Sequence, residues 1–211
     1  MQIVVAGEPV VLLAGRAILW NETVVVADVH LGKGDTFRHF GLPLPDADLD
    51  RDLHRLSALV TEHAARRLLV LGDWIHGEQG LNDDVTARVG VWRAGLDCEV
   101  ELVPGNHDKV LPPASWRMSL REDGHTEGPF RFVHKPGRAS GAYTWCGHVH
   151  PGIIAGRGRL AERFACFWIA PELGMLPAFG SFTGSFTVRP TPDDTVVAIT
   201  SDGLVRLQGG S

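Results

Sequence analysis

Side chains that can bind metal ions occur in five short segments of the chain. In order, these are Asp28-Val29-His30, Gly72-Asp73, Gly105-Asn106-His107-Asp108, His134-Lys135-Pro136 and Gly147-His148-Val149-His150. Neutral imidazoles, carboxylates and amide oxygens are ligands that pairs of divalent cations take in proteins. Two such ions side by side acidify water and neutralise phosphate oxygens. The order of the segments therefore predicts a two-metal site that hydrolyses a phosphate ester.

The residue types suggest how the metal ligands divide their work. Asp28 and His30 lie two apart at an expected strand end, so both side chains can point the same way and bind one ion. Asp73 has two carboxylate oxygens and can bridge two ions, while Asn106 offers a neutral amide oxygen. The remaining nitrogen ligands are His134, His148 and His150, the last two on a segment expected to be extended. A hydroxide bridging the two ions is expected to attack phosphorus in line.

His107 has a different expected role, because its neighbour Asn106 already serves as a ligand. An imidazole beside the phosphate can protonate the leaving oxygen, which typically accelerates such reactions by ~10²–10⁴. Asp108 is expected to orient that imidazole. His76, three residues after Asp73, could reach the phosphate or contact a metal ligand.

Composition limits the class of protein. The 211 residues carry a net charge of −5 and suit one domain over residues 1–211. No segment reaches the ~18–20 apolar residues needed to cross a bilayer. The first residues lack the basic start of a secretory signal, and three widely spaced cysteines suggest a reduced compartment. We therefore expect a cytoplasmic protein that is not a generally basic nucleic-acid binder.

The charges are nevertheless distributed unevenly. No acid occurs from Gly128 to Ala161, a stretch that holds Arg131, Lys135, Arg138, Arg157 and Arg159. Two interpretations stay open: chance, or a cationic surface for a polyanion. The candidate substrate-binding residues are Lys33, Arg38, His76, Lys135 and Arg138. Lys109 and Arg157 are further candidates for lining a basic groove. Possible surfaces for stacking of bases are Trp74, Trp145 and Phe37.

The hydrophobic pattern predicts the elements that position these residues. Strands are expected at 10–13, 17–20, 23–27, 68–71 and 99–103, with helices at 46–67 and from about 82. Further strands are expected at 130–134, 143–146, 163–169, 195–200 and 204–207. The first three metal-binding segments each follow a strand, where open α/β sheets bind ligands. The pattern favours an α/β protein with two sheets packed face to face and helices outside.

As a set, the five segments resemble the calcineurin-like metallophosphoesterase superfamily. The resemblance implies a four-layer αββα sandwich of two packed mixed sheets flanked by helices. It also implies His107 as the leaving-group acid and two ions that share Asp73. The implied ligands are Asp28, His30, Asp73 and His150 for one ion and Asp73, Asn106, His134 and His148 for the other.

A narrower likeness is to the DNA-ligase-associated branch of that superfamily. It is carried by residues 27–33, 37–38, 41–45, 71–73 with His76, His134 with Pro136, 147–151 and 176–184. This branch implies a manganese-dependent phosphodiesterase or nuclease of bacterial DNA repair, acting beside an ATP-dependent ligase and a helicase. Iron or zinc are the alternative metals. Serine/threonine phosphatases of the superfamily carry Gly-Asp-x-Val-Asp-Arg-Gly, but Gly72-Asp73-Trp74-Ile75-His76-Gly77 lacks that Arg, which argues against protein phosphatase activity.

Three hypotheses about function follow. The first is a phosphodiesterase acting on nucleic-acid ends or single strands. The second is the same chemistry on a small nucleotide, and the third is an inactive binding scaffold with this fold. The complete ligand set together with His107 argues against the scaffold. A polymer needs an open basic groove, whereas a small nucleotide needs a closed pocket with aromatic walls.

Overall fold

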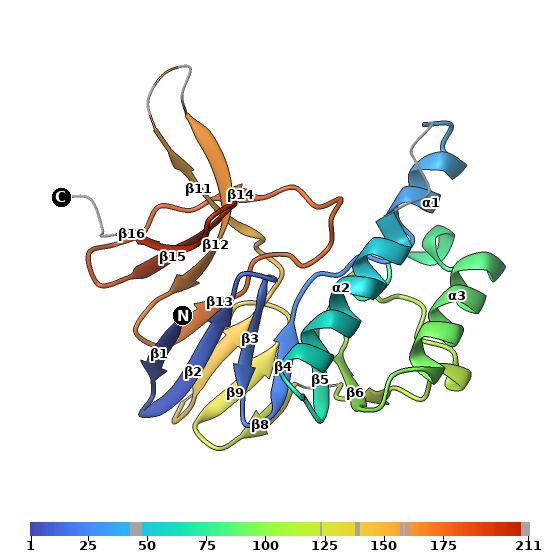
Figure 1. Cartoon of the computed structure of the whole chain (residues 1–211), viewed down its shortest axis with the longest axis horizontal. Coiled ribbons are helices and arrows are strands. Elements are labelled where there is room, and N and C mark those ends of the chain that lie inside the picture. Colours follow the sequence, from blue (N-terminus) through green and yellow to red (C-terminus); the bar gives the residue numbers. More distant parts are fainter. Residues whose placement is uncertain (43–47, 123, 138–139, 157, 159–160, 208–211) are drawn as a thin grey trace.

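Two mixed β-sheets pack against each other, and helices lie along the outer side of the first sheet (Figure 1). This arrangement comes from a computed structural model that describes residues 1–42, 48–122, 124–137, 140–156, 158 and 161–207. The predicted α/β sandwich of two sheets is confirmed. No helix among the described residues is long and apolar enough to cross a membrane.

The first sheet has seven strands that lie side by side in chain order. They are β1 (Gln2–Val5), β2 (Glu8–Leu13), β3 (Ala17–Trp20), β4 (Thr23–Val26), β5 (Arg67–Leu71), β6 (Glu99–Val103) and β7 (Ser119–Leu120). Strands β1 to β4 pair antiparallel and β4 to β7 pair parallel. The carboxyl ends of β4, β5 and β6 therefore meet at one edge, which brings together the first three predicted metal-binding segments.

Three α-helices accompany the first sheet: α1 (Lys33–His39), α2 (Asp48–Glu62) and α3 (Asp83–Ala94). Two short 3-10 helices are also present: η1 (Glu78–Gly80) lies between β5 and α3 in the chain, and η2 (Ala114–Trp116) lies between β6 and β7. Apolar residues of α2 and α3, among them Leu53, Leu56 and Val89, pack on one face of the sheet. The helix predicted from about residue 82 is α3, and it begins after a capping Asn82, whose side chain accepts a hydrogen bond from the Val85 amide at 2.8 Å.

The helix expected at 46–67 is shorter than predicted. It ends at Glu62, because Ala64 has a left-handed φ of 46° and β5 already starts at Arg67. The backbone amide of Arg66 instead donates to the Glu22 carbonyl at the edge of β4. Residues 46 and 47 lie outside the described residues. Helix α1 falls between the strand predicted at 23–27 and the helix predicted at 46–67, where the sequence pattern predicted no helix.

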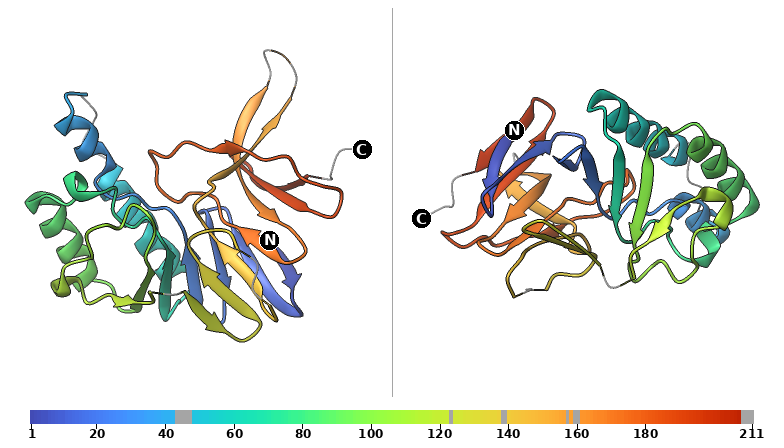
Figure 2. Two further views of the ribbon diagram at one scale, coloured as in Figure 1. Left: turned by 180° about the vertical axis from the view of Figure 1, so that it is seen from behind. Right: turned by 90° about the horizontal axis from the view of Figure 1, so that it is seen from below.

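The second sheet is built almost entirely from the later half of the chain. Its order is β14 (Phe186–Thr187), β11 (Pro151–Ala155), β12 (Glu162–Ile169), β13 (Leu173–Met175), β10 (Tyr143–Cys146), β9 (Phe130–Val133) and β8 (His125–Glu127). Strand β15 (Thr195–Thr200) pairs with β12, and β16 (Gly203–Leu207) pairs with β15. All five strands predicted beyond residue 128 are present. The β11–β12 hairpin projects beyond the rest of the sheet (Figures 1 and 2).

The inner faces of both sheets form a continuous apolar core. It contains Val25 and Leu69 from the first sheet and Phe132, Trp145 and Phe167 from the second. The opposite face of β12 and β15 carries only a small cluster around Cys166. Among the described residues, no helix covers that outer face. The helical layer implied for both sides of the sandwich is therefore seen only on the first sheet.

Trp145 lies in this core, fully buried, with its ring 5.4 Å from that of Tyr143. We expect Trp145→Ala to lower the free energy of unfolding by about 3–5 kcal/mol, because it removes a large buried side chain and leaves a cavity. Urea unfolding followed by circular dichroism measures the loss. Val205→Ala, at an exposed position of β16, is the control and should change stability little. A loss below about 1 kcal/mol would contradict the core assignment.

Candidate active site

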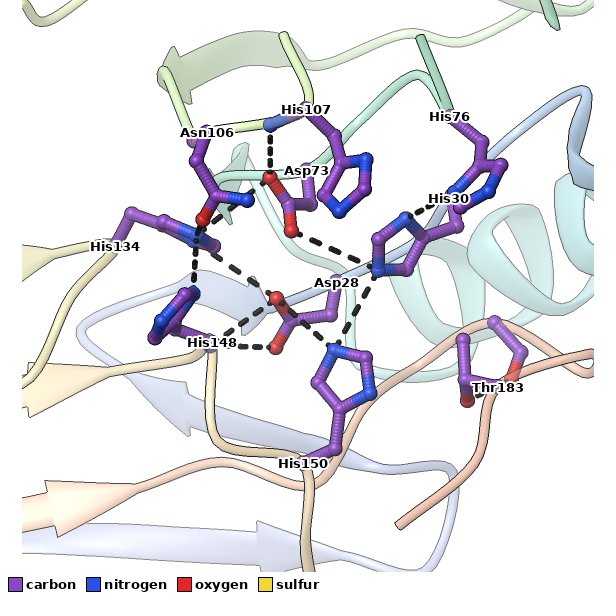
Figure 3. A network of polar contacts seen from close by, with 12 residues as sticks. Asp28, His30, Asp73, His76, Asn106, His107, His134, His148, His150 and Thr183 are labelled. Carbon is purple, nitrogen blue, oxygen red and sulfur yellow. Dashed lines mark hydrogen bonds and ion pairs between the residues drawn. The ribbon is translucent and has the colours of Figure 1, made fainter. Parts of the chain in front are cut away.

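The predicted metal-binding residues lie together where strands of both sheets end (Figure 3). Asp28 follows β4, Asp73 follows β5 and Asn106 follows β6 in the first sheet. His134 follows β9 and His148 follows β10 in the second sheet. The parallel pairings of β4 with β5 and of β9 with β10 place these ends at the same edge of the sandwich.

One group of ligand atoms is centred on Asp28. The Asp28 Oδ1 atom lies 3.4 Å from His150 Nε2, and that nitrogen lies 3.4 Å from His30 Nε2. His30 Nε2 is also 3.7 Å from Asp73 Oδ2. Each side chain of this group offers one ligand atom, and these atoms all lie within 4.8 Å of one another. The group consists of Asp28, His30 and His150.

A second group surrounds the other oxygen of Asp73. His134 Nε2 lies 3.5 Å from Asp73 Oδ1 and 3.0 Å from Asn106 Oδ1. The same nitrogen is 3.2 Å from His148 Nδ1. The two oxygens of Asp73 therefore face different groups, as expected for a bridging carboxylate.

These groups have the donor chemistry and spacing of divalent metal sites. Ligands at ~2.0–2.2 Å from one ion lie roughly 3–3.5 Å from one another, which matches the distances above. Burial, with the neighbouring His150 and His76, lowers the pKa of His30 to about 2, so its imidazole is neutral. Burial also lowers the pKa of His148. Neutral nitrogens that face each other without a proton repel, and a cation between them removes the repulsion.

Backbone carbonyls orient two of the imidazoles. His134 Nδ1 donates to the Leu71 carbonyl at 3.0 Å, and His150 Nδ1 donates to the Gly184 carbonyl at 3.2 Å. A carbonyl oxygen can only accept, so each ring keeps its proton on Nδ1 and leaves Nε2 free for a ligand.

The backbone at these residues is mostly left-handed. Asp28, His30, Asp73, His148 and His150 have φ values of 55°, 53°, 51°, 69° and 52°. The expectation that His148 to His150 is extended is therefore wrong. The convergence of the side chains comes from alternating left-handed residues, a conformation that is costly outside glycine and concentrates at functional sites.

His107 lies beside both groups. Its backbone amide donates to Asp73 Oδ1 at 2.8 Å, and its ring centroid is 5.1 Å from that of His30. The His76 ring stacks on the His107 ring with their centroids 4.9 Å apart, and His76 Nδ1 lies 3.0 Å from His30 Nδ1. Burial and the nearby Lys33 lower the pKa of His76 to about 4. His76 therefore contacts a candidate ligand directly, one of the two roles that its position suggested.

Asp108 is buried and makes two hydrogen bonds to backbone. Its carboxylate oxygens accept from the Ile75 amide at 3.0 Å and the Gly105 amide at 2.8 Å. These bonds tie the segment after β5 to the segment after β6. The orienting role expected for Asp108 toward His107 stays a prediction.

The candidate substrate-binding residues are more dispersed. Lys33 is half-buried beside His30, and Arg38 pairs with Asp35 at 2.7 Å. Lys109 and Lys135 are exposed, whereas Arg138 and Arg157 lie outside the described residues. Trp74 and Trp145 are fully buried, so the prediction that they are stacking surfaces is wrong. Phe37 does lie beside the site, with its ring stacked on that of His76.

Residues 176–184 support the site in a way that the sequence motifs did not reveal. The Phe179 amide donates to the Ala27 carbonyl at 2.8 Å and the Gly180 amide to the Asp28 carbonyl at 3.2 Å. Further along, the Gly184 carbonyl holds His150. This segment thus contacts two candidate ligands. The resemblance singled out this stretch, but its residue types alone indicate no chemistry.

Asp52 of α2 anchors the same segment. Its buried carboxylate accepts from the Ser181 amide at 2.9 Å, the Ser181 hydroxyl at 2.6 Å and the Arg55 guanidinium at 2.8 Å. Arg55 in turn donates to the Phe179 carbonyl at 2.9 Å. Asp52 is therefore a positioning residue that acts through the segment on His150.

We expect Asp52→Ala to lower the affinity for Mn²⁺ by about tenfold, a typical effect for residues that support metal ligands. Calorimetric titration of the metal-free protein measures the affinity, and melting curves check the fold. Asp50→Ala is the matched control, because that exposed carboxylate on the same helix pairs with Arg88 at 2.8 Å. Unchanged Mn²⁺ affinity in a folded Asp52→Ala protein would contradict the positioning role.

Comparison with known proteins finds similarity to a solved structure. No family model and no curated protein matches the sequence. The crystal structure of the Pseudomonas putida nuclease MPE is similar at a TM-score of 0.86 and 30% sequence identity, over 98% of this chain and 99% of that chain. This agrees with a metallophosphoesterase-like fold. At this identity and coverage, the chain belongs to the same family as the Pseudomonas putida nuclease MPE.

Proposed function

We propose that this protein is a metal-dependent phosphodiesterase that cleaves nucleic acid. The observation that carries the proposal is the pair of ligand groups that share Asp73, with His107 beside both. The nuclease title of the similar structure supports the choice of a nucleic-acid substrate. The calcineurin-like ligand pattern of the sequence supports two ions, and its likeness to the DNA-ligase-associated branch supports Mn²⁺ as the metal.

In the proposed mechanism, the protein holds the reacting groups in place. When bound, two divalent ions supply Lewis-acid chemistry at the phosphate. Asp28, His30 and His150 would hold one ion, and Asn106, His134 and His148 would hold the other, with Asp73 available to both. The amide of His107 fixes Asp73 Oδ1 at 2.8 Å and so keeps the shared carboxylate between the groups.

His107 acts on the leaving group. Its half-buried imidazole lies beside His30 and His76, at the side of the site away from His134 (Figure 3). From there it donates a proton to the ester oxygen as the P–O bond breaks, which avoids release of an unprotonated alkoxide. His76 orients His30 through the 3.0 Å contact between their Nδ1 atoms.

The biological setting is a finer part of the proposal. The likeness of residues 27–33 and 176–184 to the DNA-ligase-associated branch supports a role in bacterial DNA repair beside an ATP-dependent ligase and a helicase. The competing candidate is a small-nucleotide phosphodiesterase. Exposed Lys109 and Lys135 near the site favour a polyanionic substrate instead.

A panel of phosphate esters tests this function. We expect the Mn²⁺-loaded protein to cleave labelled DNA and bis-p-nitrophenyl phosphate, and to lose both activities when the metal is removed with EDTA. Asp73→Asn should abolish both and lower the metal content measured by elemental analysis, because it weakens the shared ligand. Cleavage of cyclic nucleotides without cleavage of DNA would favour the small-nucleotide candidate. An active Asp73→Asn protein with two tightly held metals would exclude the bridging role.

A second variant tests the leaving-group acid. His107→Asn should slow cleavage of DNA by ~10²-fold or more while both metals stay bound. The loss should be smaller for bis-p-nitrophenyl phosphate, because nitrophenolate leaves without a proton. Steady-state rates on the two substrates measure the difference. Equal losses on both would indicate that His107 binds the phosphate and donates no proton.

A further inference from the structure

A row of aromatic rings leads from the candidate active site to the surface. The rings of His107 and His76 stack at 4.9 Å, and those of His76 and Phe37 at 6.3 Å. Phe37 then meets the ring of Phe182 edge-on at 5.9 Å. The four residues come from the segments after β6 and β5, from α1 and from residues 176–184. We call these four residues the aromatic row.

The outer end of the row is not needed for the apolar cores. Neither Phe37 nor Phe182 belongs to the core on the helical side or to the core between the sheets. Phe182 keeps 42% of its surface exposed. The exposed face of Phe182 is therefore available to contact a ligand beside the site.

A crevice lies beside this outer end. His30 and Lys33 line one part of it, and Asp52, Phe182 and Thr183 line another. The crevice as a whole admits little more than a water molecule, so a flat ring would rest on its rim against Phe182. The crevice is continuous with the ligand groups through His30, which places its rim next to the reacting phosphate.

The charge at the crevice suits a polyanion. Its three acids are already paired: Asp35 with Arg38 at 2.7 Å, Asp48 with Arg51 at 3.2 Å, and Asp52 with Arg55 at 2.8 Å. Lys33 makes no ion pair with any described residue. A half-buried cation without a carboxylate partner, next to a phosphate site, is available for a substrate phosphate.

We propose that Phe182 and Phe37 form a stacking subsite for the base of a nucleotide that flanks the scissile phosphate, with Lys33 contacting the neighbouring phosphate. The inference rests on the proposed function and adds a recognition element to it. A π-face binds any base, so the subsite senses the presence of a base and not its identity. It contributes to substrate binding, and its loss raises KM more than it lowers kcat.

Two substrates of equal charge isolate the contribution of the base. One is an oligothymidylate, and the other is the same backbone with tetrahydrofuran abasic residues in place of the nucleosides. We expect the wild-type protein to cleave the oligothymidylate with a kcat/KM about tenfold higher, since stacking of a base on an aromatic ring has an effect of that order. The difference should lie mainly in KM.

Three variants test whether Phe182 carries this preference. Phe182→Leu keeps apolar bulk but lacks a π-face, so the preference should fall to about twofold or less. Phe182→Trp should keep it. Phe186→Leu is the matched control, because Phe186 is exposed on β14 and does not line the crevice, so the wild-type preference should persist. A purely structural role for Phe182 would slow cleavage of both substrates equally and leave the preference unchanged.

The outcomes separate this inference from the proposed function. Cleavage of both oligomers at the same kcat/KM by the wild-type protein would overturn the stacking subsite and leave the nuclease activity intact. An undiminished preference in Phe182→Leu would overturn it as well. Cleavage of bis-p-nitrophenyl phosphate without cleavage of either oligomer would overturn the nucleic-acid function and the subsite with it.

Discussion

Asp73 is the constraint on which the rest of the site depends. Its two oxygens face two different groups, one around His30 at 3.7 Å and one around His134 at 3.5 Å. The His107 amide holds Oδ1 at 2.8 Å. One carboxylate thus fixes the separation of the ligand groups and, through the same hydrogen bond, the position of the residue proposed as acid. A shift of β5 against β6 would therefore disturb both ligand groups and the position of His107.

The left-handed backbone at the ligands is costly, at about 1 kcal/mol or more for each non-glycine residue. The surrounding hydrogen bonds offset that cost and hold the strained turns in place. The His30 amide donates to the Asp73 carbonyl at 2.8 Å, and the His148 amide donates to Asp28 Oδ2 at 2.9 Å. Gly147 is required beside them, because a Cβ there would lie 2.6 Å from Asp28 Oδ2. The same left-handed residues both strain the backbone and direct the candidate ligand side chains toward one another.

Support for the site also comes from parts of the chain that bind no metal. Asp52 holds Ser181, and the segment after it reaches His150 through the Gly184 carbonyl at 3.2 Å. Asp108 joins the segments after β5 and β6. These contacts bridge residues far apart in sequence, and no local spacing indicates them. They explain why Asp52 and Asp108, which lie outside the ligand groups, are nevertheless buried.

The sequence alone predicted which candidate ligands come together, because residue type and the position after a strand are local properties. It also determined most strands and the approximate start of α3, which depend on hydrophobic periodicity. Tertiary structure decided the rest. It buried Trp74 and Trp145, gave Asp108 two backbone partners, and placed Phe182 beside Phe37. Burial and long-range contacts depend on how the two sheets pack, and that packing has no signature within any one segment.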